Sequence, residues 1–230
     1  MVSAKDILIK PITAHTANAL VKKVHYSGKV VANSVLHFGV FLGGRLEGVM
    51  SFGSPMIKKN AHKMVEGTTW NGMLELNRMA FSDALPKNSE SRALGVAFRL
   101  IKKHYPHIEW VLSYSDSTQC GDGTIYRASG FVLTQIKEST QLAINPETGE
   151  VMQSMAAFHA GKTKEFSSWD KLKGFQLRYI YFLNKDAKQR LTVPILPFSD
   201  IDKMGAGMYK GVKVSREKQA MDVSNITAAG

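Results

Sequence analysis

The spacing of apolar residues in the first half of the chain predicts alternating strands and helices. Residues 5–12 form a short segment rich in β-branched side chains, which is typical of a strand. The apolar runs 36–42 and 46–52 flank Gly43-Gly44, and two glycines supply the positive φ angles of a tight hairpin turn. The other elements predicted here are a helix with the apolar stripe Ala17, Leu20, Val21 and Val24, a strand over 73–81 and a helix over about 90–104.

The second half predicts further strands in a different order. A strand over 110–114 precedes a short helix over 122–129, and Gly130 suits the residue just after a helix end. The remaining predicted elements are a strand over 131–137, a hairpin around 145–149 and a strand over 177–183. Because strands and helices mix around one central hairpin, we expect an α+β fold with a mixed sheet.

The last residues of the chain lack this patterning. Residues 200–230 contain little apolar periodicity and many small or polar side chains, which is typical of a weakly ordered tail. We therefore expect one domain over 1–185 and a basic, weakly ordered C-terminal extension over 186–230.

The composition is globular with a strong basic excess. Of 230 residues, 44% are hydrophobic and 21% charged, which excludes wholesale disorder. Thirty Lys and Arg against nineteen Asp and Glu give a net charge of +11. That excess favours a polyanionic partner, and nucleic acid is the commonest one.

The cysteine count and the absence of long apolar runs indicate a cytoplasmic location. Cys120 is the single cysteine, which excludes an intrachain disulfide and a zinc site built from several thiolates. No apolar run approaches the roughly 20 residues that span a bilayer, and the N-terminus lacks the apolar core of a signal peptide. We expect a soluble protein of the reducing cytoplasm.

Two segments carry candidate chemistry. Arg92 to Ala97 opens a helix, whose free N–H groups and positive dipole end suit a phosphate, and Gly95 would allow a close approach. An ordinary amphipathic helix is the alternative. Tyr126 lies beyond a strand end, where its phenol could reach a leaving group; a buried tyrosine with a satisfied hydroxyl is the alternative.

Together these segments resemble the GNAT acyltransferase superfamily. Arg-x-x-Gly-x-Ala at 92–97 is followed by Tyr126-x-x-x-Gly130-Phe131, and the element order agrees over roughly residues 5–137, extending with the last strands to about 183. The resemblance implies a GNAT-like mixed, centrally split sheet flanked by helices. It also implies an acyl-CoA donor, acetyl-CoA or a related molecule, held by Arg92, Gly95 and Ala97, with Tyr126 as general acid.

A narrower resemblance rests on five motifs that recur in order across about 100 residues. These motifs are His25-Tyr26-Ser27-Gly28, Leu76-Asn77-Arg78, Asn88-Ser89-Glu90-Ser91, Tyr114-Ser115-Asp116 and Thr124-Ile125-Tyr126. They look like the Mom family of phage DNA-modification proteins, which implies a GNAT-like enzyme that installs a carbamoylmethyl group on N6 of adenine. Carried over by motif, the implied catalytic residues are His25, Tyr26, Arg78, Ser91, Asp116 and Tyr126.

For these residues, a physical argument for a role in catalysis stands beside a simpler structural explanation. Arg78 on a strand needs an anion, which a phosphate, Asp116 or a structural salt bridge would supply. His25 could titrate as a base near neutral pH, or be an exposed loop histidine. Tyr26 could stack on an extruded base. Asp116 ends a strand at the carboxyl edge of the sheet, where it could act in chemistry or cap the next turn.

Basic residues in loops are the candidate DNA contacts. Lys29, Lys58, Lys59 and Lys63 fall in segments predicted to be irregular, and Trp70 could stack on bases. The alternative for each lysine is simple solvation. Double-stranded DNA is the expected partner, and the sequence leaves open whether the chain forms a homodimer. It shows no secure metal site.

The sequence therefore predicts an enzyme that converts adenine in phage DNA to N6-carbamoylmethyl-adenine and so protects that DNA from host restriction in the host cytoplasm. One alternative is a conventional GNAT N-acetyltransferase acting on a protein, a tRNA or a small-molecule amine. A third is an inactive GNAT-like module that binds DNA.

Overall fold

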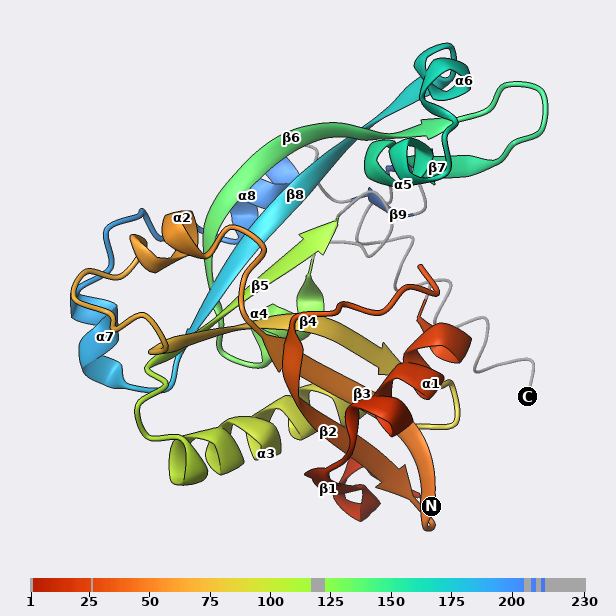
Figure 1. Ribbon diagram of the computed structural model, residues 1–230. Coiled ribbons are helices and arrows are strands. Elements are labelled where there is room, and N and C mark those ends of the chain that lie inside the picture. The colour runs from red at the N-terminus through yellow and green to blue at the C-terminus, as the bar shows by residue number, and fades with distance from the viewer. Residues whose placement is uncertain (1, 26, 117–122, 205–207, 210–211, 214–230) are drawn as a thin grey trace. The chain divides into compact units, whose positions relative to one another are not determined.

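The computed structural model (Figure 1) describes residues 2–25, 27–116, 123–204, 208–209 and 212–213. Its main element is an eight-stranded mixed sheet with the strand order β1-β2-β3-β4-β5-β8-β6-β7. The strands are β1 (Leu8–Pro11), β2 (Ser34–Leu42), β3 (Arg45–Gly53), β4 (Met73–Phe81), β5 (Trp110–Asp116), β6 (Val132–Ile144), β7 (Val151–Gln153) and β8 (Asp170–Phe182). A separate pair consists of β9 (Met208–Tyr209) and β10 (Val212–Lys213).

The helices are short apart from two. They are η1 (Ala4–Asp6), α1 (Ala14–Val24), α2 (Lys58–His62), α3 (Ser89–His104), α4 (Thr124–Ala128), α5 (Ser154–His159), α6 (Thr163–Ser167), α7 (Lys185–Gln189) and α8 (Ser199–Lys203). None of the helices in the described ranges has the length and apolar content that a membrane crossing requires.

The chain divides into two compact units. Unit 1 comprises Met1–Ser113, Ile125–Val132 and Tyr179–Ile195, and unit 2 comprises Tyr114–Thr124, Leu133–Arg178 and Leu196–Gly230. Strands β5, β6 and β8 contribute residues to both units. A domain boundary at residue 185 stays a prediction.

In unit 1, two helices cover opposite faces of strands β1 to β4 (Figure 1). Ala17 and Val21 of α1 pack on Val49 and Ala80. Phe98 of α3 contacts Phe52, with 6.4 Å between the ring centroids. Since Val49 and Phe52 are three residues apart in one strand, their side chains point to opposite faces. The predicted hairpin is confirmed: β2 pairs antiparallel with β3, and Gly43 and Gly44 have φ values of 55° and 82°.

The sheet is split at its centre, as the family resemblance implies. β4 runs parallel to β5, but only Met73, Leu74 and Glu75 pair, with Trp110, Val111 and Leu112 respectively. Both strands continue for several residues beyond this pairing. The expected α+β fold with a mixed, centrally split sheet is therefore confirmed.

A second irregularity lies on the other edge of β4. Ser51 pairs with Arg78 while its neighbour Phe52 pairs with Leu76, so Asn77 is the extra residue of a β-bulge. A bulge bends the strand and redirects its side chains. The residues of the predicted Leu76-Asn77-Arg78 motif are the ones that this bulge displaces.

Unit 2 differs most from the prediction. β6 and β8 are longer than the predicted strands 131–137 and 177–183, and residues 154–167 contain α5 and α6, which the apolar spacing did not reveal. The hairpin around 145–149 is confirmed, with the Asn145 N–H donating to the Glu150 carbonyl at 2.8 Å. α5 and α6 pack through a small cluster of Ala143, Ala157, Phe166 and Trp169.

The C-terminal segment is only partly described. Ser199–Lys203 forms α8, and Ile201 is buried, so the expectation of weak order is wrong for these residues. Burial of that one isoleucine explains how a segment with little periodicity holds a helical turn. Residues 214–230 lie outside the described residues.

Candidate active site at the split of the sheet

Strand β4 carries three polar residues in an otherwise apolar sequence. Glu75 is the last residue of β4 that pairs with β5, so it lies where the two strands part. Asn77 occupies the bulge and accepts a hydrogen bond from Ser34 Oγ at 3.0 Å. Arg78 follows it and pairs in register with Ser51 of β3. The split and the bulge thus place a carboxyl, an amide and a guanidinium within four residues of one another.

Glu75 is the group in this cluster that titrates near neutral pH. Burial raises its pKa from 4.5 to about 7, while a hydrogen bond with the Asn77 side chain and the charge of Arg78 act in the opposite direction. A carboxyl with such a pKa exists in both protonation states at neutral pH. It is therefore suited to accept a proton from a substrate and release it again.

Arg78 ties the strand to the loop that follows α1. Its Nε donates to the Lys29 carbonyl at 2.9 Å, and its Nη1 donates to the Asn77 carbonyl at 2.8 Å. These two contacts are to backbone oxygens, where the sequence suggested an anionic partner. The guanidinium therefore orders the loop while its charge acts on Glu75 and His25.

His25 ends α1 and begins that loop. Its Nδ1 accepts the Ser27 backbone N–H at 3.1 Å and lies 2.8 Å from Ser27 Oγ. A ring nitrogen that accepts a backbone N–H carries no proton, so the neutral ring has its proton on Nε2. Burial and then Arg78 lower the His25 pKa from 6.5 to about 4. The expectation that His25 titrates near neutral pH is therefore wrong. Tyr26 lies outside the described residues.

A buried row of polar side chains crosses three strands beside this cluster. His37 of β2 pairs in register with Ser51 of β3, which pairs with Arg78 of β4. Residues paired across antiparallel strands lie on the same face, and here this is the face that α1 covers. His37 is 5% exposed and its Nδ1 lies 2.8 Å from Ser51 Oγ. Burial lowers the pKa of His37.

Gly53 allows the backbone segments around the cluster to meet. A Cβ at this position would lie 2.0 Å from the Asn33 carbonyl oxygen and 2.7 Å from Asn77 Oδ1. Asn33 Nδ2 in turn donates to the Ser54 carbonyl. The end of β3 is therefore fixed against the segment before β2, and no side chain fits at residue 53.

α3 begins at Ser89, three residues before the segment predicted to open it, and the Arg92 N–H already donates to the Asn88 carbonyl at 3.2 Å. Its N-cap Asn88 is left-handed, with φ of 69°, and its side chain makes no capping hydrogen bond. An added Cβ at Gly95 would meet only Arg99 Nη1, at 3.9 Å, so no packing within the described residues requires a glycine there. Arg92 is exposed, and its nearest acceptor is the Lys5 carbonyl at 3.5 Å.

Two further predicted site residues, Ser91 and Ala97, make contacts within α3 or with the core. Ser91 Oγ donates to the Asn88 carbonyl at 3.2 Å, within the first turn. Ala97 is fully buried on the side of α3 that faces the core, next to Phe98. Its methyl group therefore has a packing role, unlike Arg92 and Gly95 on the opposite side.

Tyr126 lies on α4, as predicted, with Gly130 at φ of 83° just after it. Its ring stacks on Tyr179 at 4.9 Å between centroids and meets Phe131 edge-on at 5.1 Å. Phe131 also contacts Phe98 of α3, at 5.6 Å. The Tyr126 ring is thus part of the aromatic cluster that joins α4 to α3.

In unit 2, Asp116 is the last residue of β5 and is half-buried, as expected for a residue at the strand end. The same unit contains Arg178, a buried arginine on the neighbouring strand β8, which the sequence analysis did not identify. Its Nε donates to Thr134 Oγ1 at 2.9 Å and its Nη2 to the Thr134 carbonyl at 3.2 Å. Burial lowers the Arg178 pKa, and Tyr114 opposes that shift.

The predicted DNA contacts lie in two places in unit 1. Lys29 is exposed in the loop after α1. Lys58 and Lys59 begin α2, a short helix in a segment expected to be irregular, and Lys63 follows it. Lys59 and Lys63 are exposed, whereas Lys58 is half-buried.

Sequence reasoning missed Glu75, His37 and Ser51. Glu75 had a usable signal, because a carboxylate two residues from Asn77-Arg78 in an apolar strand is expensive unless it serves a purpose. His37 and Ser51 had none, since only strand register brings them beside Arg78.

Comparison with known proteins adds a family match over most of the chain. The model of the Mom protein family matches residues 6–200. A relative from Escherichia phage Mu, named methylcarbamoylase mom, is 35% identical over 198 residues, which cover 84% of this chain and 82% of that relative.

Several solved acetyltransferase structures are also similar at low sequence identity. Spermidine/spermine N-acetyltransferase SpeG from Vibrio cholerae is 9% identical with a TM-score of 0.49, covering 81% of this chain and 98% of that one. IAA acetyltransferase from Bacillus cereus is 13% identical with a TM-score of 0.46, covering 76% and 99%.

Glu75→Gln should stabilise the protein at high pH. The Glu75 pKa is raised from 4.5 to about 7 in the folded chain, so its stabilising contribution is complete below 4.5 and is lost as the pH rises through about 7. Glutamine does not titrate. The variant should exceed the wild type by about 2–3 kcal/mol in unfolding free energy above neutral pH, and match it in acid.

Urea unfolding at an acidic and an alkaline pH measures this difference. Glu138→Gln, an exposed position on β6, is the control and should behave like the wild type at both. Equal unfolding free energies of Glu75→Gln and the wild type above neutral pH would show that the pKa of Glu75 is not raised in the folded protein.

Proposed function

The chain belongs to the Mom protein family, and from this premise we propose that it converts adenine in double-stranded DNA to N6-carbamoylmethyl-adenine, which protects phage DNA from host restriction. The observation that carries the chemical part of this proposal is Glu75, a carboxyl with a pKa of about 7 at the split of the sheet. A proton acceptor of this strength is what an amine nucleophile needs at neutral pH.

Adenine N6 makes two demands on such an enzyme. Its lone pair is delocalised into the ring, so the amine is a poor nucleophile and loses a proton only as it reacts. The base must also leave the helix stack to reach any buried group. Glu75 would accept the N6 proton. His25, neutral at physiological pH and protonated on Nε2, would donate a hydrogen bond to the edge of the extruded base.

The remaining residues have supporting roles in this proposal. Arg78 would hold the loop that carries His25 and Tyr26, through its bond to the Lys29 carbonyl. Tyr126 would donate a proton or orient the donor group through its hydroxyl. Ser91 and Asp116 are assigned to the reaction centre by their motifs.

An acyl-CoA would be held at the start of α3. The residues present fit a pyrophosphate at the first turn of α3, because the N-cap Asn88 leaves that turn without a side-chain cap. Gly95, in the second turn, leaves space there for the ligand because it has no side chain. Ser113, one residue past the last β4–β5 pair, is buried and its Oγ has no partner among the described residues. That polar atom suits a ligand group entering the split. When bound, the thioester supplies an activated carbonyl carbon.

The identity of the donor is constrained by the product. Acetyl transfer alone would give an N-acetyl amide, whereas a carbamoylmethyl group has a methylene on N6 and an additional nitrogen. Acetyl-CoA cannot supply that nitrogen. Any thioester attacked at its carbonyl carbon places a carbonyl on N6, so the methylene and the additional nitrogen come from a glycine-derived group or from further processing of the transferred acyl group.

Mass spectrometry of nucleosides tests the proposed function. DNA from cells that express the protein should contain deoxyadenosine heavier by a carbamoylmethyl group, and DNA from cells that express Glu75→Gln should not. Unmodified deoxyadenosine together with turnover of acetyl-CoA on an amine would identify a conventional acetyltransferase. Salt-sensitive DNA binding with no product would identify an inactive module.

Tyr126→Phe should separate chemistry from packing. Phenylalanine keeps the stack on Tyr179 and the contact with Phe131, and removes only the hydroxyl. Loss of a general acid lowers the rate about 10²–10⁴-fold, while loss of a hydrogen-bonded hydroxyl costs about 1 kcal/mol of stability. Adenine modification and melting temperature are the two measurements. A fully active Tyr126→Phe with a slightly lower melting temperature would show that Tyr126 has only a packing role. Asp116→Asn is the companion variant, because it keeps the shape of the side chain and removes its charge.

Gly95→Ala should stabilise the protein and weaken its binding of CoA. Alanine is about 1 kcal/mol better than glycine inside a helix, and its methyl group meets only Arg99 Nη1 here. The same methyl would stand between the backbone and a bound pyrophosphate. Calorimetric titration with CoA should therefore show lower affinity in a variant with a higher melting temperature. Unchanged CoA affinity would place the cofactor elsewhere.

A further inference from the structure

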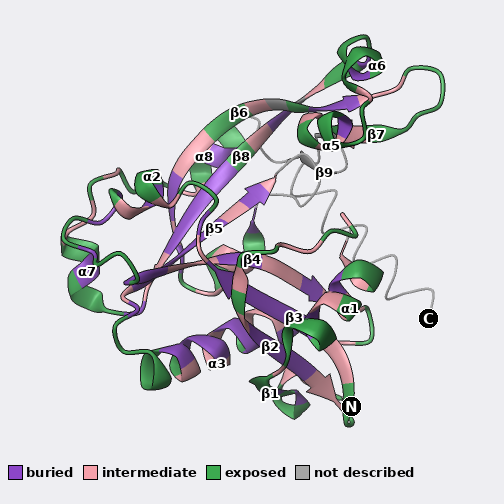
Figure 2. Ribbon diagram, viewed as in Figure 1, coloured by how far each residue is buried: buried purple, intermediate pink, exposed green. Residues whose placement is uncertain are grey.

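A basic and apolar surface surrounds α2 in unit 1. We define the α2 surface as Met56, Ile57, Lys58, Lys59, Lys63 and Trp70. Met56 is 91% exposed, Ile57 62% and Trp70 56%. Exposed apolar side chains that are grouped in this way are typical of an interaction site. In Figure 2, α2 and the loop before it are largely exposed.

The segment 56–70, which carries these side chains, is held in place by its buried residues. Ala61, Met64, Val65 and Thr68 are buried. Trp110 Nε1 donates to Thr68 Oγ1 at 3.0 Å, and Val65 forms a β-bridge with Leu191. The exposed side chains therefore stand on a fixed base.

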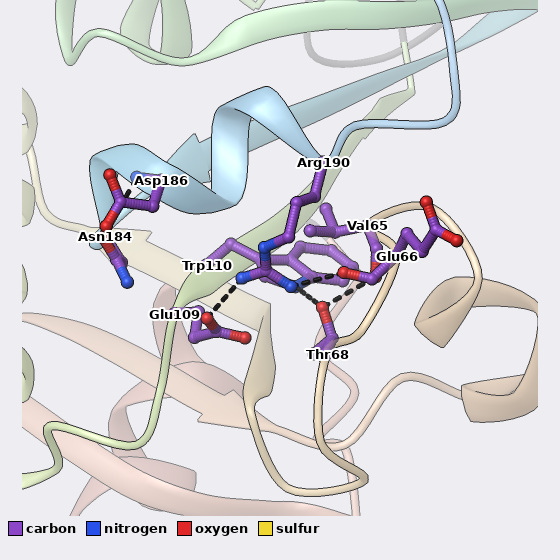
Figure 3. A network of polar contacts seen from close by, with 8 residues as sticks. All are labelled: Val65, Glu66, Thr68, Glu109, Trp110, Asn184, Asp186 and Arg190. Atoms are coloured by element: carbon purple, nitrogen blue, oxygen red, sulfur yellow. Dashed lines mark hydrogen bonds and ion pairs between the residues drawn. The ribbon is translucent and has the colours of Figure 1, made fainter.

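Arg190 completes this anchor, as Figure 3 shows. Its guanidinium donates to the Glu66 carbonyl and pairs with Glu109, while its own carbonyl accepts the Glu66 N–H at 2.9 Å. The loop is thus bonded to the start of β5 and to the end of α7. Such a framework keeps the exposed apolar groups from folding back into the core.

Trp70 is held in place but not covered. Lys58 Nζ lies 4.7 Å from the centre of its ring and also donates to Asn71 Oδ1 at 3.1 Å. The His62 ring lies 5.6 Å away at an angle of 45°. More than half of the indole remains accessible, which leaves an aromatic face for a further stacking partner.

The charge of the surface fits a polyanion. Residues 54–65 contain three lysines and no acidic residue. At protein–protein interfaces aromatic residues and Met are enriched but Lys is depleted, because a buried ammonium is costly. Apolar side chains interleaved with lysines instead match DNA, where apolar bases alternate with phosphates.

The α2 surface also lies close to Glu75, the proposed proton acceptor. Gly53 pairs with Glu75, and Met56 is three residues beyond Gly53. Three extended residues span at most roughly 11 Å. Side chains at 56 and 57 are therefore within a few base-pair steps of the Glu75 carboxyl.

We infer that the α2 surface binds duplex DNA and opens it for the reaction. Lys58, Lys59 and Lys63 contact phosphates. Met56 and Ile57 enter the base stack beside the target adenine, as apolar wedges do in proteins that kink DNA. Trp70 stacks on a base exposed by this opening. This inference rests on the proposed function for its target, but the opening of the duplex is measurable without any modification.

Permanganate oxidation of thymine provides the measurement, because it attacks thymines that have lost their stacking. The probe is a duplex fragment that presents adenine–thymine pairs in many sequence contexts. Wild-type protein bound without donor should produce reactive thymines in this fragment. The variant Met56→Ser with Ile57→Ser should bind within about twofold of the wild type, since no lysine is lost, but produce no reactive thymine. Its modification rate should fall at least about tenfold.

Two control variants isolate the surface. Leu8→Ser removes another exposed apolar side chain, 58% exposed on β1, and should leave both readouts unchanged. Lys58→Glu with Lys59→Glu should lower DNA affinity and flatten its salt dependence, whereas Lys5→Glu with Lys10→Glu makes the same change of charge and should have a smaller effect.

The outcomes distinguish this inference from the proposed function. Reactive thymines that persist in Leu8→Ser but vanish in Met56→Ser with Ile57→Ser support the wedge, even if deoxyadenosine proves to be unmodified in cells. Wild-type complexes without reactive thymines would overturn it, as would a serine pair that opens DNA normally. Lys58→Glu with Lys59→Glu binding as tightly as the wild type would also overturn it, and would indicate that the surface receives a protein.

Discussion

The parallel pairing of β4 with β5 is the constraint on which unit 1 depends. Parallel strands cannot be joined by a tight turn, so the chain must cross over, and α3 is that crossover. Only three residue pairs hold the two strands together before they part. Phe98 of α3 then packs against both Phe52 and Phe131, which keeps the helix on the sheet where strand pairing has ended. Glu75 is half-buried at this point, and that burial raises its pKa to about 7.

Strand β4 lies between the proposed binding sites for the donor and for the DNA duplex. α3 and its start follow the carboxyl end of β4 at Phe81, while the α2 surface precedes the amino end at Met73. A donor held at α3 and a duplex held at α2 would approach Glu75 from opposite ends of one strand. Such an arrangement suits a reaction between a large cofactor and a large polymer, because neither needs to pass the other.

The sequence predicted those parts of the molecule that depend on local pattern. The stripe of α1, the Gly43-Gly44 hairpin and α3 follow from residues a few positions apart, and all are confirmed. The titration of His25 could not be predicted in this way, because it depends on burial and on Arg78, which lies 53 residues further along the chain. The α5 and α6 helices are too short for a periodic signal, and they are stabilised by contacts with Ala143 and Trp169. Glu75 was overlooked because a single carboxylate in a strand produces no periodic pattern. Its apolar neighbours were the available signal, because burying a carboxylate among them costs free energy.

The charge of Arg78 adds to the effect of burial on the pKa of His25 and opposes the effect of burial on the pKa of Glu75. Its positive charge disfavours a second cation, so it helps to hold His25 neutral, and it favours an anion, so it limits how far burial raises the pKa of Glu75. Without that charge, Glu75 would bind its proton more tightly and would be a poorer acceptor at neutral pH, while His25 would move toward the cationic form. A cationic His25 would still donate from Nε2, but it would draw the Glu75 proton equilibrium back toward the carboxylate. Burial and one guanidinium together therefore keep a neutral donor and a titrating acceptor in the same cluster. The bonds from Arg78 to the Lys29 and Asn77 carbonyls fix the position of that guanidinium.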